Sequence, residues 1–238
     1  MRPAMTISAF AAATVAISLT LTGCGGGDST DSASSASSAS SSEAETSAAE
    51  SSEPPAGTTA AAPAENQTVG DYLDAQGVKQ TIVKRGEPGA PTLNLPMPEG
   101  WADVGADTPE DAYGAIYLQS AQGTPNPPAI LARMARLEGG QFDVAKILEL
   151  SPNAVTKTPG WDGPIAGQPS TLGGFDAVAI AGTAQVNGTP NFVARKTVVI
   201  PAAANTYILA LDAQGPVDQQ QVLMDAMAVI DEQTTIEP

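Results

Sequence analysis

The pattern of hydrophobic and polar positions divides the chain near residue 68. Before that point there is one uncharged apolar run, residues 9–21, and then a long stretch dominated by Ser, Ala, Thr and Glu. After it, apolar residues recur with periods of two and of three to four, as they do in strands and helices. We therefore predict a leader over residues 1–23, a segment without a core over residues 24–66, and one folded domain over residues 67–238.

The period-two segments predict six strands, at residues 92–97, 113–120, 129–137, 175–185, 192–200 and 206–212. Asn187-Gly188 separates two of them, and this dipeptide favours a tight hairpin turn. Residues 123–128 are rich in turn formers and predict a looser hairpin. Because most connections are too short to hold crossover helices, the strands should pair antiparallel.

Three segments predict helices. Thr68-Val69-Gly70-Asp71 resembles a capping box and opens a helix over residues 69–76, which Gly77 ends. Asp143 can cap a second helix that breaks near Ser151-Pro152. The last helix, residues 217–232, carries an apolar stripe made of Val222, Leu223, Ala226, Met227, Val229 and Ile230. The expected fold class is α+β, with a mainly antiparallel sheet of about six strands and helices packed on it.

The leader has the features of an export signal. Arg2 gives a thin positive start, and the apolar run is too short to span a bilayer comfortably. Leu21-Thr22-Gly23-Cys24 then resembles the bacterial lipobox, in which the cysteine thiol receives a diacylglyceryl group. The alternative is an ordinary secretory signal followed by a cysteine without a role. We predict lipidation at Cys24, and an exported protein anchored on the outer face of the cell membrane, within the envelope.

Residues 25–66 carry acidic side chains but no Lys, Arg or aromatic residue. Such a composition cannot bury enough apolar surface to offset the entropy of ordering, so we expect a flexible linker. Its r.m.s. reach is about 35 Å. A plain spacer is the simplest interpretation, and an O-glycosylated stalk is the alternative.

Composition excludes several classes of function. The net charge is −16, with 10 Lys plus Arg against 26 Asp plus Glu, which argues against binding nucleic acid. The chain has no histidine, which removes Ser-His-Asp chemistry and His-containing zinc sites. With one cysteine it forms no intrachain disulfide. We predict no cofactor, no metal and no enzymatic activity.

An ordered set of motifs resembles the LpqN/LpqT family of mycobacterial lipoproteins. The set is Gly86-Glu87-Pro88-Gly89-Ala90-Pro91-Thr92-Leu93-Asn94-Leu95-Pro96, Pro98-Glu99-Gly100-Trp101, Leu172-Gly173-Gly174-Phe175, Lys196-Thr197-Val198-Val199-Ile200-Pro201, Met224-Asp225-Ala226 and Ile230-Asp231-Glu232-Gln233-Thr234-Thr235-Ile236. The resemblance implies a PsbP-like α/β/α sandwich. It also implies an envelope protein associated with mycolic-acid glycolipids and their transport. It supplies no catalytic motif, and Trp161 stands where most relatives have Phe.

Four aromatic residues are candidate ligand contacts. Trp161 lies in a loop rich in Gly and Pro, where it either contacts a ligand or partner or anchors the loop. Trp101 either packs in the core or stacks on sugar. Tyr113 and Tyr117 share a strand face at a spacing of four, where core packing is the alternative. The adjacent cations Arg195-Lys196 and Lys84-Arg85 are expected on solvated strand faces, and contact with anionic head groups is the alternative.

Two classes of function fit these observations. The leading hypothesis is a tethered, non-enzymatic lipoprotein that binds an envelope glycolipid, or the proteins that export it, in a groove between sheet and helices. The alternative is a protein-interaction module with no small ligand, whose partner belongs to the envelope or, if the domain is shed, to a host.

Overall fold

The computed structural model of the chain describes residues 67–238. The predictions for the leader, for Cys24 and for the linker lie outside the described residues. The strands are β1 (Lys79–Val83), β2 (Thr92–Asn94), β3 (Trp101–Asp103), β4 (Gly114–Leu118), β5 (Ala129–Glu138), β6 (Gln168–Leu172), β7 (Phe175–Val186), β8 (Thr189–Pro201), β9 (Thr206–Pro216) and β10 (Thr235–Glu237). The helices are α1 (Val69–Ala75), α2 (Val144–Leu150), α3 (Asn153–Thr156) and α4 (Gln220–Gln233), with 3-10 turns η1 (Gly105–Asp107), η2 (Gln119–Ala121) and η3 (Val217–Gln219).

Eight strands form one sheet in the order β3-β4-β5-β9-β8-β7-β6, with β1 also paired to β5. All of its ladders are antiparallel. Strands β2 and β10 form a small antiparallel pair of their own. The α+β class and the antiparallel sheet are confirmed. The number of strands within residues 67–238 exceeds the expected six, because β1, β3, β6 and β10 were not predicted.

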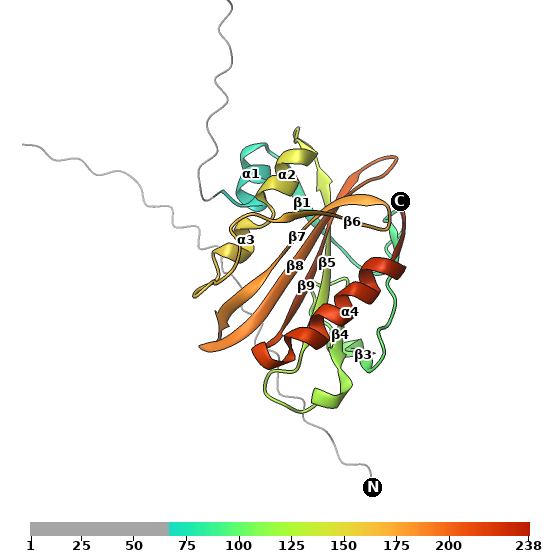
Figure 1. Cartoon of the computed structure of the whole chain (residues 1–238). Helices are drawn as coiled ribbons and strands as arrows, with labels where there is room; N and C mark the ends of the chain where they lie inside the picture. The colour runs from blue at the N-terminus through green and yellow to red at the C-terminus, as the bar shows by residue number, and fades with distance from the viewer. Residues whose placement is uncertain (1–66) are drawn as a thin grey trace, which may run out of the picture. The chain divides into compact units, whose positions relative to one another are not determined.

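Helices cover both faces of the sheet. We call the side onto which Leu209 and Leu211 of β9 point the α4 face, because Leu223, Ala226 and Ile230 of α4 pack against them in the main core. Figure 1 shows α4 lying obliquely across the sheet, while α1 and α2 lie together near one end.

The opposite face carries a second, smaller core. It joins Leu73 of α1 and Ile147 of α2 to Val199 of β8. Val199 alternates with Val198 and Ile200, which belong to the main core. Helices α1 and α2 therefore pack on the reverse of the sheet, and the expected α/β/α layering is confirmed.

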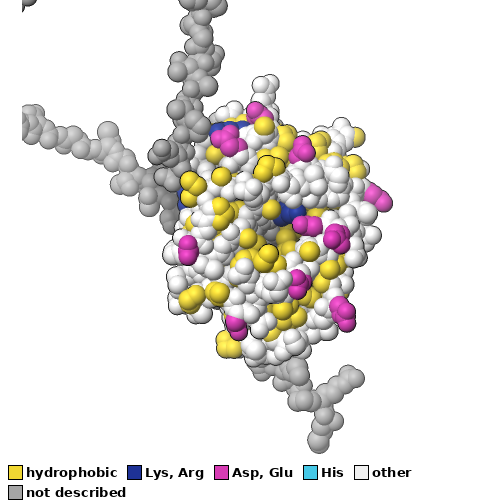
Figure 2. All heavy atoms as spheres, in the orientation of Figure 1, with side chains coloured by type: hydrophobic (Ala, Val, Ile, Leu, Met, Phe, Trp, Pro, Cys, Tyr) yellow, Lys and Arg dark blue, Asp and Glu magenta, His cyan; other side chains and the backbone are white. Residues whose placement is uncertain are grey.

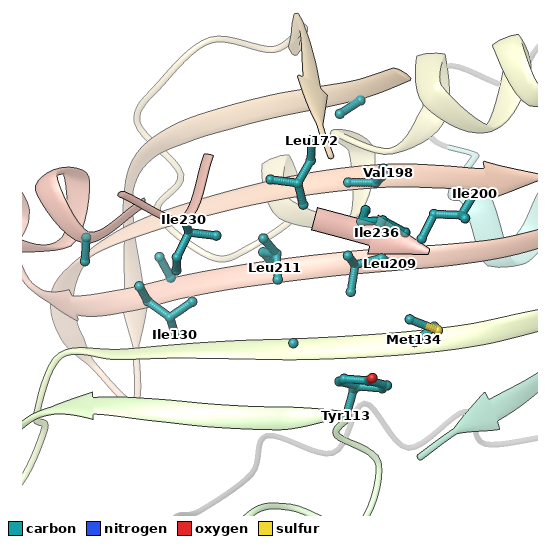
Figure 3. Packing of buried hydrophobic residues seen from close by; sticks show 14 of the residues in the cluster. Tyr113, Ile130, Met134, Leu172, Val198, Ile200, Leu209, Leu211, Ile230 and Ile236 are labelled. Atoms are coloured by element: carbon teal, nitrogen blue, oxygen red, sulfur yellow. The ribbon is translucent and has the colours of Figure 1, made fainter. Parts of the chain in front are cut away.

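The main core is closed at one end by the small β2–β10 pair. Ile236 of β10 is 8% exposed, and Leu93 of β2 packs against the same cluster. Figure 3 shows Ile236 and Ile230 directed toward Leu209 and Leu211 of β9. The segment around Leu93 thus lies over the α4 face beside the helix.

Local sequence explains the element ends. Thr68 and Asp71 form the predicted capping box at the start of α1, and the Asp143 side chain caps α2. Asn187 and Gly188 have φ of 52° and 76°, as the predicted two-residue hairpin turn requires. The final helix begins later than predicted, because residues 217–219 form the 3-10 turn η3.

Candidate functional site

An apolar groove of about 420 Å³ lies on the α4 face, between α4 and strands β7 and β8. Its lining is Pro164, Gln168, Ala179, Ile180, Ala181, Phe192, Ala194, Arg195, Lys196, Met224, Met227, Ala228 and Asp231. Figure 2 shows hydrophobic side chains gathered around a hollow in this face, with charged side chains of both signs beside it. The volume falls in the range of sites that bind small organic ligands.

Small side chains on the sheet create this space. Ala179 and Ala181 are two residues apart on β7, so both side chains point to the α4 face. Ala194 of β8 lies directly opposite Ala181. Phe192 is buried at 3% exposure, whereas Met224 of α4 is 47% exposed at the rim. A groove with an alanine floor and thioether walls suits a flexible hydrocarbon chain, because methionine adapts to irregular apolar shapes.

An ion pair between a buried lysine and a partly exposed aspartate marks one part of the groove. The Lys196 side chain is 4% exposed, and its Nζ lies 2.7 Å from Oδ2 of Asp231, which is 37% exposed. The same Nζ donates to Oγ of Ser170 at 2.8 Å and to the carbonyl of Thr171 at 3.4 Å. The Lys196 charge is therefore satisfied by the protein, while Asp231 can still accept hydrogen bonds from outside.

Trp161 anchors the loop that borders the groove. Its indole Nε1 donates to the carbonyl of Pro164 at 3.1 Å. The ring lies so close to Gly182 of β7 that a Cβ there would be 2.8 Å from it. Gly182 alternates with Ala181 and so points to the opposite face of the sheet. Half-buried Trp161 holds Pro164 at the groove without lining it.

The other predicted aromatic contacts lie elsewhere. Trp101, 5% exposed, is part of the main core at the start of β3. Tyr113, 6% exposed, packs in the same core, and its hydroxyl accepts a long 3.5 Å hydrogen bond from the Leu93 amide. Tyr117 alternates with Ile116, which packs on the main core, so the two tyrosines do not share a face as expected. Their roles as ligand contacts stay predictions.

A second cavity, of about 260 Å³, lies on the other side of α4. It is enclosed between the segment Leu93–Met97 and the sheet residues Ile130, Ala132 and Leu211. Arg85 lines this cavity. Its guanidinium carbon lies 5.9 Å from the centroid of the Tyr113 ring, and its Nη1 lies 3.3 Å from Oδ2 of Asp103. This cavity is smaller than the groove, and Tyr113 is the predicted site residue that lines it.

The expectation for the adjacent cations is wrong for Lys196. Successive side chains of a strand point to opposite faces, so the Lys196 side chain is buried on the α4 face, whereas the Arg195 side chain points to the reverse although this residue also borders the groove. Arg195 and Arg133 both bind the Asp212 carboxylate there, and Arg133 also pairs with Asp111 at 2.8 Å. Burial alone would lower the pKa of the Arg195 guanidinium. The charge of Asp212 and the hydrogen bond to it outweigh burial, so the pKa of Arg195 is raised.

Within residues 67–238, no group of three or more acidic or thiol side chains is arranged to hold a metal ion. In the same part of the chain, no helix combines the length and apolar character needed to cross a membrane.

The amino-acid sequence did not predict which strands and helix form the groove. The signal for it was the alternation of alanines at 177, 179 and 181, which predicts a strand face without bulk.

The geometry defines a three-layer α+β domain with an open apolar groove, and comparison with known proteins gives it a family. A family model described as "Probable lipoprotein LpqN" matches residues 65–237. Lipoprotein LpqN of Mycobacterium tuberculosis (strain ATCC 25618 / H37Rv) is 40% identical over 174 residues, covering 73% of this chain and 75% of that protein.

A solved structure agrees with this match. It is a crystal structure of LpqN described as involved in cell envelope biogenesis of Mycobacterium tuberculosis. It matches with a TM-score of 0.68 and 39% identity, covering 73% of this chain and 99% of that one. The chain therefore belongs to the LpqN lipoprotein family, and the resemblance seen in the sequence motifs is confirmed.

Proposed function

We propose that this protein is a lipid-anchored, non-enzymatic lipoprotein of the cell envelope that binds an acylated glycolipid in the groove beside α4. The observation that carries the proposal is the apolar groove of about 420 Å³, floored by Ala179, Ala181 and Ala194. Family membership and the envelope role described for the M. tuberculosis relative support the setting. The lipobox at Cys24 supports the anchor.

The groove accounts for an acyl chain. Burying hydrocarbon contributes about 0.8 kcal/mol per CH₂ before entropic losses, so affinity should rise with chain length until the groove is full. Met224 and Met227 can repack around chains of different shape. A chain held this way needs no charged partner, which agrees with a domain that has few cations.

The rim accounts for a neutral, hydroxyl-rich head group such as an acylated trehalose. Asp231 offers a carboxylate that is still partly exposed, and Gln168 offers an amide. The Asp231 carboxylate can accept hydrogen bonds from sugar hydroxyls, and the Gln168 amide can both donate and accept them. Lys196 holds the Asp231 carboxylate in place, which lowers the entropy lost when a sugar binds.

Titration of alkyl-trehaloses of increasing chain length, followed by tryptophan fluorescence, tests the proposal. Trp161 reports on the groove because its indole is hydrogen-bonded to Pro164. Affinity should increase with chain length, free trehalose should bind weakly, and salt should have little effect. Because Trp161 does not line the groove, calorimetry of the same titration decides the outcome: no binding heat at any chain length would contradict ligand binding and favour the interaction module.

A filled groove gives the sharper test. Ala181 is exposed on the groove floor, so Ala181→Leu should place an isobutyl group where the chain lies. We expect at least about a tenfold loss of alkyl-trehalose affinity with little change in the free energy of unfolding. The matched control is Ala203→Leu, an exposed alanine in the β8–β9 connection. Equal affinity in both variants would place the ligand elsewhere.

A further inference from the structure

The loop of residues 163–167 carries Ile165, which is the most exposed of the large hydrophobic side chains within residues 67–238. Ile165 is 83% exposed, whereas Ile82, Met97, Val217 and Met224 are between 41% and 50% exposed. Pro164 and Ala166 on either side are exposed and uncharged as well. An aliphatic side chain held this far into solvent marks a contact surface.

The base of this loop is fixed to the edge of the sheet. Asp162 and Thr183 exchange two backbone hydrogen bonds, of 2.8 and 2.9 Å. At the other end, Gly167 approaches β7 so closely that a Cβ would be 2.2 Å from Val178. The tip therefore projects from a clamped base, and little conformational entropy is lost when it binds.

The tip is continuous with the mouth of the groove. Pro164 lines the groove, and its carbonyl accepts the hydrogen bond from Trp161. Met224 adds a second exposed apolar side chain at the rim. From Thr158 to Thr171 the only charged residue is Asp162, whose backbone belongs to the clamped base. An apolar tip flanked by a half-buried tryptophan has the composition of a membrane-interface anchor.

We propose that Pro164, Ile165 and Ala166 insert into the surface of a lipid layer with uncharged or zwitterionic head groups, so that the groove opens where amphiphiles leave that layer. This proposal rests on the lipid-anchored binding function proposed above. A tip of three residues presents far less area than a stable protein interface needs. Against a lipid layer that area suffices, because the lipid anchor proposed at Cys24 and a linker with the expected r.m.s. reach of about 35 Å raise the local concentration of the domain at the layer.

Charge points to the same kind of layer. The chain carries a net charge of −16, and the loop has no Lys or Arg. Binding through cations to anionic lipid is therefore not the driving force. Insertion should depend on the aliphatic tip and persist at high salt, and anionic lipid should weaken it.

Quenching of Trp161 emission by lipid tests the insertion. The chain starting at Cys24 is coupled through this single thiol to maleimide lipid in phosphatidylcholine vesicles with brominated acyl chains. Insertion places Trp161 near the bromine atoms and quenches it, whereas Trp101, 5% exposed in the core, gives a constant background. Ile165→Asp should lower the docked population by about tenfold and restore most of the lost emission. Ile165→Leu should keep the quenching.

Ile82→Asp is the matched control, because Ile82 is an exposed isoleucine on β1 and lies outside the groove. It should leave the quenching unchanged. Equal quenching in Ile165→Asp and the parent chain, or no quenching in either, would overturn the insertion. Titration with soluble alkyl-trehalose separates the two proposals: Ile165→Asp should bind it like the parent chain, since Ile165 does not line the groove.

Discussion

The two faces of strand β9 show how one sheet serves two purposes. Its burial alternates strictly along Thr206–Pro216. On the α4 face, Tyr207, Leu209 and Leu211 are at most 1% exposed. On the reverse, Ile208 and Asp212 are half-buried. The same strand thus supplies a closed core on one side and a partly hydrated surface on the other.

The difference lies in how each face is covered. Helix α4 and the β2–β10 pair cover the apolar face, but beside α4 the cover ends over an alanine floor, which leaves the groove. On the reverse, α1 and α2 cover one end, and elsewhere Arg133 and Arg195 converge on Asp212. Charged side chains occupy that part of the reverse face, so an apolar ligand gains more from burial in the groove of the α4 face.

Truncation of one side chain on each face of β9 should give the largest difference in unfolding free energy between the two faces. Leu211→Ala removes a side chain that is 1% exposed under α4 and should cost about 3 kcal/mol of unfolding free energy. Ile208→Ala, on the neighbouring residue of the other face, should cost about half as much because that side chain is half-buried. Urea denaturation measures both values. Equal losses would show that the two faces are equally well packed.

The long elements were predictable because their signals are local. The Asn187-Gly188 turn, the Thr68 and Asp143 caps and the stripe of the last helix each specify structure within a few residues. The missed strands lack such a signal. Gln168–Leu172 contains proline and polar residues, and it becomes a strand because β7 offers an edge to pair with.

The candidate site was harder to predict because it depends on tertiary placement. The sequence shows that residues 195 and 196 are both cationic, but only the sheet and α4 together place Asp231 against Lys196. The position of Trp161 in a glycine-rich loop was visible. That its ring would lie against Gly182 and hold Pro164 required the fold.

The ion pair between Lys196 and Asp231 shows how much a charged contact contributes to stability on the otherwise apolar α4 face. Asp231→Ala leaves Lys196 buried with only Ser170 and Thr171 as partners, and should cost about 2 kcal/mol. This loss of unfolding free energy is smaller than the loss from breaking a fully buried ion pair, because Asp231 is 37% exposed. Lys196→Met keeps the volume without the charge and should change stability by less than about 1 kcal/mol. Thermal or urea unfolding of both variants decides it: a larger loss for Lys196→Met would mean that the cation itself stabilises the groove.

The smallest effect should appear on the reverse face at low pH. The hydrogen bond from Arg133, aided by its charge, holds the pKa of Asp111 below the usual value. Because the folded pKa lies below the unfolded one, this stabilisation is complete above about pH 4 and is lost as the pH falls through the folded pKa. Asp111 is half-exposed, so Asp111→Asn should cost only a few tenths of a kcal/mol at pH 7. Urea midpoints of the two chains should approach each other as the pH falls below about 4. A gap that stays constant from pH 7 through the acid range would assign the effect to shape rather than to charge.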